Sequence, residues 1–161
     1  KESIEQETPG AIVHVAGSAD RDIEDMDMIV TATSGAGKRI LDITRVKPGC
    51  VITDVARRLD ISAEDVAKRP DVLVIESGEV QLPGNHVLAE TIVLALEGRF
   101  ENFTLGRNIE WEKVRYIYKL GLKHGMTLAA ISGVNGVFSE EDFERVRVLA
   151  AKSDVGETVD L

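Results

Sequence analysis

An early apolar strand is followed by small hydroxyl side chains whose type and spacing suit ligand binding. Residues 28–30 are apolar without alternation, which is typical of a strand covered on both faces in a parallel sheet. Three hydroxyl residues lie beyond it, at Thr31, Thr33 and Ser34, and a glycine-rich turn covers residues 35–37. Small side chains let a ligand approach the backbone, and such a turn before a helix can donate backbone N–H groups to an anion. The pattern predicts that a ligand binds at this end of the strand.

The same change from apolar to polar side chains recurs in two later strands. Residues 50–55 are largely apolar and become acidic at Asp54, and residues 71–77 are apolar until Glu76 and Ser77. The ligand crevice of an open α/β sheet lies outside the carboxyl ends of its strands. We therefore expect these polar side chains to face one shared crevice.

Asp54 is the carboxylate that most needs an explanation. A carboxylate near the end of an apolar strand requires a partner, because burying an unpaired charge is costly. Two interpretations stay open: an orienting contact to a cofactor or substrate, and a salt bridge to Arg57 or Arg58. These two arginines, with Lys38 and Arg39, form a basic group that either is solvated or binds phosphate or an acidic carrier.

Two other chemistries are excluded by the residues themselves. A nucleotide-hydrolysing P-loop needs glycine at position 32 and serine or threonine at position 39, but the chain has Ala32 and Arg39. The magnesium-binding hydroxyl is therefore missing. The single cysteine, Cys50, opens its strand and should lie at the amino edge of the sheet, so we expect a buried, inert thiol.

The elements that would position these residues alternate between strand and helix. Strands are predicted at residues 11–16, 28–30, 50–55, 71–77 and 126–131, and helices at 1–8, 18–27, 37–46, 62–68, 88–96, 109–124 and 139–152, with a loop at 81–85. Alternation of this kind predicts an α/β fold with a doubly wound, Rossmann-like parallel sheet and a C-terminal helical cap. We expect one partial domain over residues 1–161, with a strand–helix core at 1–87 and the C-terminal helices and last strand at 88–161.

Composition limits the classes of partner. The 161 residues carry a formal net charge of −9, which argues against nucleic acid, because its binding needs a basic surface. No apolar run approaches the roughly 20 residues of a membrane span. With one cysteine, neither an internal disulfide nor a multi-cysteine zinc site is expected, and we predict a cytoplasmic protein.

Several segments together resemble one family of dinucleotide-binding domains. They are VTATSGAGK (30–38), CVITDVARRLDI (50–61), RPDVLVIESGEVQLPG (69–84), LAETIVLALEGRFENFTLGR (88–107) and KLGLKHGMTLAAI (119–131). They resemble the C-terminal part of the NAD(P)-binding Rossmann domain of the long-chain acyl-acyl-carrier-protein reductase family, whose relatives are shikimate-dehydrogenase-like and glutamyl-tRNA-reductase-like. The stretch at 88–107 is the most specific, because VTATS recurs in many Rossmann domains.

The resemblance implies an oxidoreductase that uses NADP or NAD. It implies hydride transfer that reduces a fatty acyl thioester to an aldehyde, with a small-molecule or carrier-bound substrate. The residues that would line the ribose on the nicotinamide side are Thr31, Ala32, Thr33 and Ser34, and Gly35 would also contact the cofactor. Those that would border the nicotinamide are Asp54, Val55, Ser77 and Gly78. The resemblance identifies no catalytic residue here, because the position that matches the family's nucleophilic cysteine is Val87.

The resemblance also implies that the first strands and the GxGxxG turn of the domain would precede residue 1. Residues 1–161 alone should therefore bind the cofactor weakly and should not be active as they stand. A homo-oligomer and a missing N-terminal segment both stay open. So do two other functions: a non-catalytic interaction module with a degenerate Rossmann fold, and a shikimate-type dehydrogenase acting on a small hydroxy acid.

Overall fold

A computed structural model describes residues 1–33, 40–56, 59–76, 80–82, 85–87, 89–104 and 109–155. The chain forms two compact units. Unit 1 comprises Lys1–Ile75 and Ser139–Leu161, and unit 2 comprises Glu76–Phe138. Each unit is described by itself below.

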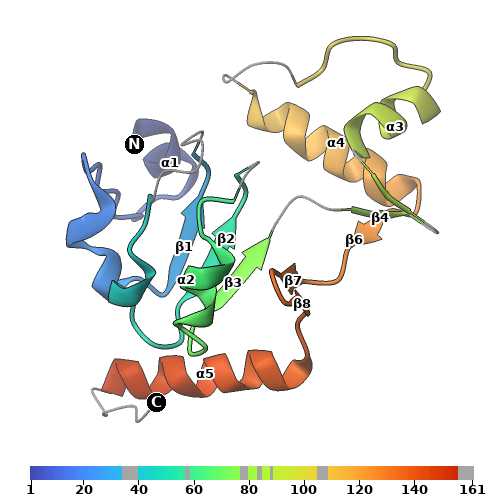
Figure 1. Ribbon diagram of the computed structural model, residues 1–161. Helices are drawn as coiled ribbons and strands as arrows, with labels where there is room; N and C mark the ends of the chain where they lie inside the picture. The colour runs from blue at the N-terminus through green and yellow to red at the C-terminus, as the bar shows by residue number, and fades with distance from the viewer. Residues whose placement is uncertain are drawn as a thin grey trace. The chain divides into compact units, whose positions relative to one another are not determined.

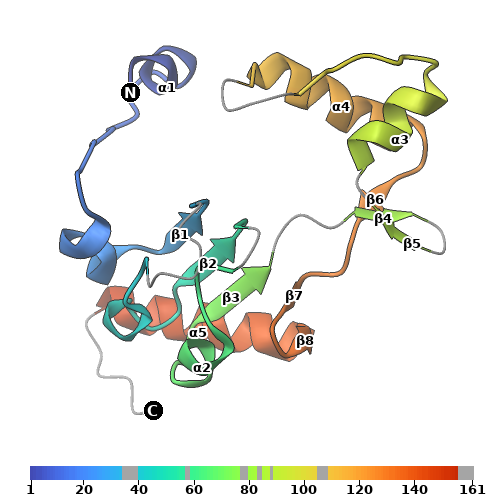
Figure 2. The same ribbon diagram turned by 45° about the horizontal axis from the view of Figure 1, so that its top comes forward.

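Three neighbouring strands form the sheet of unit 1. They are β1 (Met28–Thr31), β2 (Val51–Asp54) and β3 (Leu73–Glu76). β1 pairs with β2 in parallel, and the three arrows run side by side in the same direction (Figure 2). At the end of β3, Glu76 pairs antiparallel with β7 (Ser132–Gly133), which pairs with β8 (Gly136–Val137). The open sheet is therefore mixed, in the order β1-β2-β3-β7-β8, and the predicted Rossmann-like α/β fold is confirmed.

Apolar side chains of β2 and β3 form the core of unit 1. Ile52, Val72 and Val74 are buried with Ile43 from the preceding segment. Cys50 is buried and unpaired, and its burial raises the pKa of the thiol to about 11. The predicted burial of this cysteine is confirmed, and its inertness stays a prediction that the raised pKa of the thiol favours.

Two helices of unit 1, α2 (Ala63–Ala67) and α5 (Glu140–Val155), begin at serine caps. In front of α2, the hydroxyl of Ser62 accepts a hydrogen bond from the Asp65 backbone N–H at 3.1 Å. The long C-terminal helix α5 is capped in the same way by Ser139. α5 lies at the amino-end side of the three strands, where Gly49 touches it at Ala150 (Figure 1). The opposite, carboxyl edge of the sheet is therefore left for the candidate site.

The N-terminal part of unit 1 agrees with the predictions only in part. The helix predicted at 1–8 is present as α1 (Glu2–Glu7), but the helix predicted at 18–27 is replaced by the 3-10 turns η1 (Ala19–Arg21) and η2 (Ile23–Asp25). Residues 11–16 have no regular secondary structure, so the predicted strand is wrong there. A strand needs a hydrogen-bonded neighbour, and the only described strand at this end of the sheet, β1, pairs with β2 alone.

The helix predicted at residues 37–46 is also shorter than expected. Its described part contains only the 3-10 turn η3 (Ile43–Arg45). The Asp42 carboxylate accepts hydrogen bonds from the backbone N–H and the hydroxyl of Thr44. Such a local bond competes with the hydrogen bonds of an α-helix, which explains the short turn.

Besides the short strands β7 and β8, unit 2 contains two packed helices and a small three-stranded sheet. The helices α3 (Ala89–Leu96) and α4 (Trp111–Lys123) bury Val93, Leu120 and Met126 between them. The small sheet has the order β5-β4-β6, with bounds β4 (Val80–Leu82), β5 (Asn85–Val87) and β6 (Thr127–Leu128). The described residues of the loop predicted at 81–85 thus belong to the antiparallel strands β4 and β5, and the strand predicted at 126–131 is reduced to two residues.

Two carboxylates tie the connections of unit 2 to its helices. Glu90, at the start of α3, accepts hydrogen bonds from the backbone N–H and hydroxyl of Thr104. Glu97 accepts from Lys123 at 2.6 Å and contacts the His124 ring nitrogen at 2.5 Å, and these hydrogen bonds lower the pKa of Glu97. Both carboxylates have structural roles in this unit.

Candidate functional site at the carboxyl edge of β1 and β2

Thr31 ends β1 with a buried hydroxyl that lacks a hydrogen-bond partner. Its side chain is only 5% exposed, and among the described residues its Oγ1 is the buried side-chain oxygen without a partner. The Thr31 carbonyl accepts a hydrogen bond from the Val55 backbone N–H at 2.9 Å, which ties the ends of β1 and β2 together. Buried hydroxyls are normally paired, so this one is available to a bound polar group.

Asp54 ends β2 and organises the loop that follows it. The residue is 1% exposed, and its two carboxylate oxygens accept hydrogen bonds from the backbone N–H groups of Ala56 and Ile61, each at 3.0 Å. These bonds compensate the charge that burial takes out of water. Asp54 therefore links the backbone at Ala56 to that at Ile61, a role that neither predicted interpretation included.

Asp60 joins this loop to the end of β1. Its carboxylate accepts hydrogen bonds from the Thr33 hydroxyl at 2.6 Å and from the Thr33 backbone N–H at 3.1 Å. Sequence reasoning missed Asp60, because an aspartate between Leu59 and Ile61 beyond a strand carries no motif. Its only signal is that it falls within the segment 50–61 that carries the family resemblance.

The two carboxylates at this edge are therefore already engaged by donors of the chain. Asp54 binds backbone N–H groups and Asp60 binds Thr33, so neither is placed as a general acid or base by its described contacts. The group left for a ligand is the Thr31 hydroxyl, which can both donate and accept a hydrogen bond. Among the described residues there is no cluster of histidine, cysteine or carboxylate side chains suited to a metal ion. The Thr31 hydroxyl is therefore the candidate ligand contact at this edge.

The structure describes part of the predicted cofactor-binding set. The residues Thr31, Ala32, Thr33, Asp54 and Val55 lie together, because Thr31 is in register with Asp54 and Thr31 bonds to Val55. The other predicted residues, Ser34, Gly35, Ser77 and Gly78, lie outside the described residues, as do Lys38, Arg39, Arg57 and Arg58. Contact of either set with a cofactor stays a prediction.

The sheet and its helices define a Rossmann-like α/β protein. No protein family in the comparison matches the sequence. The chain is similar to part of the aminotransferase PigE of Serratia sp., with 35% identity over 142 residues. The alignment covers 78% of this chain but only 16% of PigE, so the chain spans less than a fifth of that relative. In the described part of the chain, no helix has the length and apolar character needed to cross a membrane.

Proposed function

We propose that this chain is the nicotinamide-side part of an NAD(P)-binding domain in an oxidoreductase. The observation that carries the proposal is the buried, unpartnered Thr31 hydroxyl at the carboxyl end of a parallel strand. Such ends border the cofactor crevice in open α/β sheets. The small residues Ala32 and Thr33 next to it leave room for a sugar or ring to lie against the backbone.

Three residues at this edge have different roles in holding the cofactor. The Thr31 hydroxyl exchanges a hydrogen bond with a polar atom of the cofactor, Asp60 positions Thr33, and Asp54 shapes the loop that borders the crevice. The bound nicotinamide supplies or accepts a hydride. We propose a fatty acyl thioester as the substrate class. With Val87 at the position of the family's cysteine, the chain offers no thiolate there for an acyl-enzyme.

The similarity to PigE, an aminotransferase, is compatible with this proposal. It describes a protein of which this chain matches 16%, so an aminotransferase activity can reside in another part of that protein. The resemblance carried by residues 88–107 favours a reductase-like role for this segment.

The test is the affinity for NADPH of the natural polypeptide that carries residues 1–161. Asp60→Asn weakens the acceptor that holds Thr33, and we expect the dissociation constant to rise about tenfold, which is roughly 1.4 kcal/mol. The matched control is Asp142→Asn, the same substitution at the cap of α5, which should leave the affinity unchanged. Both values can be measured by isothermal titration calorimetry.

Two results would count against this proposal. One is an unchanged affinity in Asp60→Asn with the fold intact by circular dichroism. The other is the absence of NADPH binding by the natural polypeptide. Residues 1–161 alone contain no GxGxxG sequence to cradle the pyrophosphate, so we expect their affinity to be far weaker than micromolar.

A further inference from the structure

The helix α4 of unit 2 exposes a row of large apolar side chains, which we call the α4 stripe. Its members follow one another at spacings of three, four and four residues, which keeps them on one face of a helix. They are Trp111, Val114, Tyr118 and Leu122, with exposed fractions of 44%, 53%, 59% and 54%. The face of α4 that packs into the core is a different one, with Leu120 buried and Ile117 partly buried. The α4 stripe is therefore an apolar surface that the core of unit 2 does not use.

Two cations border the α4 stripe. Arg115 holds its guanidinium over the Trp111 ring, 4.1 Å from the ring centroid. Lys119 follows about one helical turn later and is exposed. None of the described carboxylates forms an ion pair with either cation, whereas the other two lysines of α4 each pair with a glutamate. The positive charge beside the stripe is thus not neutralised by the part of the chain that the structure describes.

The net charge of −9 is not spread evenly over the chain. Unit 2 contains seven glutamates, no aspartate and six lysines or arginines, so its own sequence is close to neutral. Within it, α4 contains four lysines or arginines and one glutamate. Exposed charges act over about one Debye length, which is roughly 10 Å at 0.1 M salt. The local positive charge of α4 therefore decides what the α4 stripe attracts.

We propose that the α4 stripe binds an anionic lipid surface, with α4 lying in the plane of the interface. Tryptophan and tyrosine favour the headgroup level of a bilayer, because each has an apolar ring with a polar tip. Val114 and Leu122 enter the boundary of the acyl chains, and the stems of Arg115 and Lys119 extend along it with their charges among the headgroup phosphates. Binding of this kind needs no membrane-spanning helix and does not depend on the proposed cofactor.

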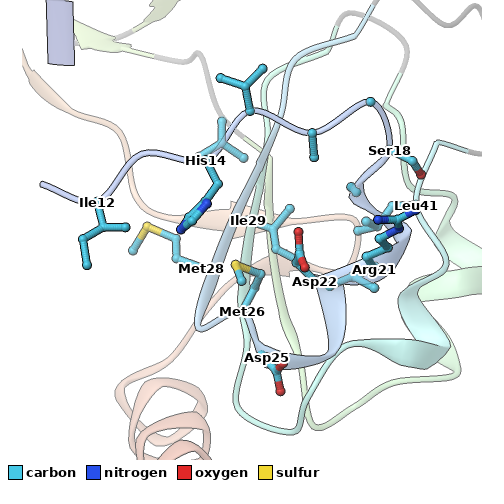
Figure 3. A pocket seen from close by; sticks show the side chains of 16 residues that line it. Ile12, His14, Ser18, Arg21, Asp22, Asp25, Met26, Met28, Ile29 and Leu41 are labelled. Carbon is cyan, nitrogen blue, oxygen red and sulfur yellow. The ribbon is translucent and has the colours of Figure 1, made fainter. Parts of the chain in front are cut away.

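The exposed apolar residues of unit 1 lie in a different electrostatic setting. A hollow of about 1190 Å³ beside β1 is lined by Met26 and Met28, but Asp22 and Asp25 line it as well (Figure 3). The two carboxylates outnumber the single cation there, Arg21. Carboxylates repel anionic headgroups, so we assign the lipid surface to the α4 stripe and not to this hollow.

A second copy of the chain is a poorer occupant of the α4 stripe. A twofold interface uses the same surface patch on both copies. Two antiparallel α4 helices that pair through the stripe would bring Arg115 and Lys119 of both copies to the same side of the interface. Like charges placed there oppose association, whereas an anionic lipid surface compensates them.

The test uses Trp111, the single tryptophan of residues 1–161, as the reporter. Vesicles of phosphatidylcholine and phosphatidylglycerol in equal amounts should shift its fluorescence to shorter wavelength and should sediment with the chain. Vesicles of phosphatidylcholine alone should bind much more weakly. An absence of binding to the mixed vesicles would overturn the proposal, and so would equal binding to both kinds, because the cations would then play no part.

A charge placed in the α4 stripe should abolish vesicle binding. Val114→Glu introduces a carboxylate at an exposed valine, so the fold should be retained and is checked by circular dichroism. Val148→Glu is the matched control at an exposed valine of α5 and should leave binding unchanged. Vesicle binding by folded Val114→Glu would contradict the assignment. So would a dimer in analytical ultracentrifugation that Val114→Glu dissociates, because the stripe would then be covered by a second copy.

The contribution of the bordering charge can be measured separately. Lys119→Gln should weaken binding to the mixed vesicles about fivefold, as expected for one cation near an anionic surface. Lys152→Gln makes the same change on α5 and should have no effect. Equal affinities in these two variants would overturn the role of Lys119 and with it the charge argument for a lipid surface.

Discussion

Replacing Asp71 with asparagine is expected to lower the free energy of unfolding by about 3–5 kcal/mol, since it leaves Arg69 as a buried charge without a counterion. Both residues are buried, with exposed fractions of 2% for Asp71 and 8% for Arg69. The guanidinium donates from Nε and Nη2 to the two carboxylate oxygens at 2.8 and 2.6 Å. Its remaining Nη1 donates to the Ile43 carbonyl at 2.7 Å, which ties the pair to the core. Urea unfolding followed by circular dichroism measures the loss.

The same pair predicts the direction of a pH dependence. Burial raises the pKa of Asp71, but the hydrogen bonds and charge of Arg69 outweigh it, so the pKa lies below its ordinary value of 3.8. A lowered pKa means that the stabilisation is complete above pH 3.8 and is lost as the pH falls through the pKa of the folded state. This acid-induced loss should be absent in Asp71→Asn.

An exposed ion pair provides the control for this effect. Glu144 and Arg147 pair on the surface of α5 at 3.0 Å, and Glu144→Gln should cost less than about 1 kcal/mol. Similar losses in Asp71→Asn and Glu144→Gln would contradict the account of a buried pair that the core depends on.

The second large effect is expected at Gly49, where α5 packs against the turn before β2. Gly49 has a φ of +82°, and a Cβ added there would overlap the backbone N and Cα of Ala150. Gly49→Ala combines left-handed strain of about 1–2 kcal/mol with an overpacking cost of about 1–3 kcal/mol. Because the obstructing atoms belong to a helix backbone, they cannot rotate away. We expect a total loss of about 3 kcal/mol in urea unfolding.

Gly10→Ala separates the two contributions to this loss. Gly10 has a φ of +92° but has no atom within 4 Å of the added Cβ. It should therefore show the backbone strain alone. If the two substitutions cost the same, the close packing of α5 against Gly49 is not important for stability.

Much of the sheet could be predicted because each of its main strands is marked by an apolar run in its own short segment of sequence. Continuous apolar runs gave the positions of β1, β2 and β3, and serine caps gave the starts of α2 and α5. These signals lie within a few residues of the element that they specify. The strand predicted at residues 11–16 was wrong for the opposite reason, because strand formation depends on a neighbouring strand that local sequence does not reveal.

The candidate site was only partly predictable for the same physical reason. Thr31, Thr33 and Asp54 could be selected because they end apolar strands. The partners of their polar groups could not, since Asp60 reaches Thr33 across 27 positions of the chain. The contact depends on where the folded chain places Asp60 beside Thr33, which local sequence does not reveal.

The central claim is that the carboxyl edge of β1 and β2 binds the nicotinamide end of NAD(P)H. It is tested most directly by following the backbone amide signals of residues 1–161 by NMR while NADPH is added to millimolar concentration. We predict concentration-dependent shifts at Thr31, Ala32, Thr33 and Val55, with the signals of α4 unchanged. An absence of shifts at these four amides, or shifts confined to unit 2, would contradict the claim.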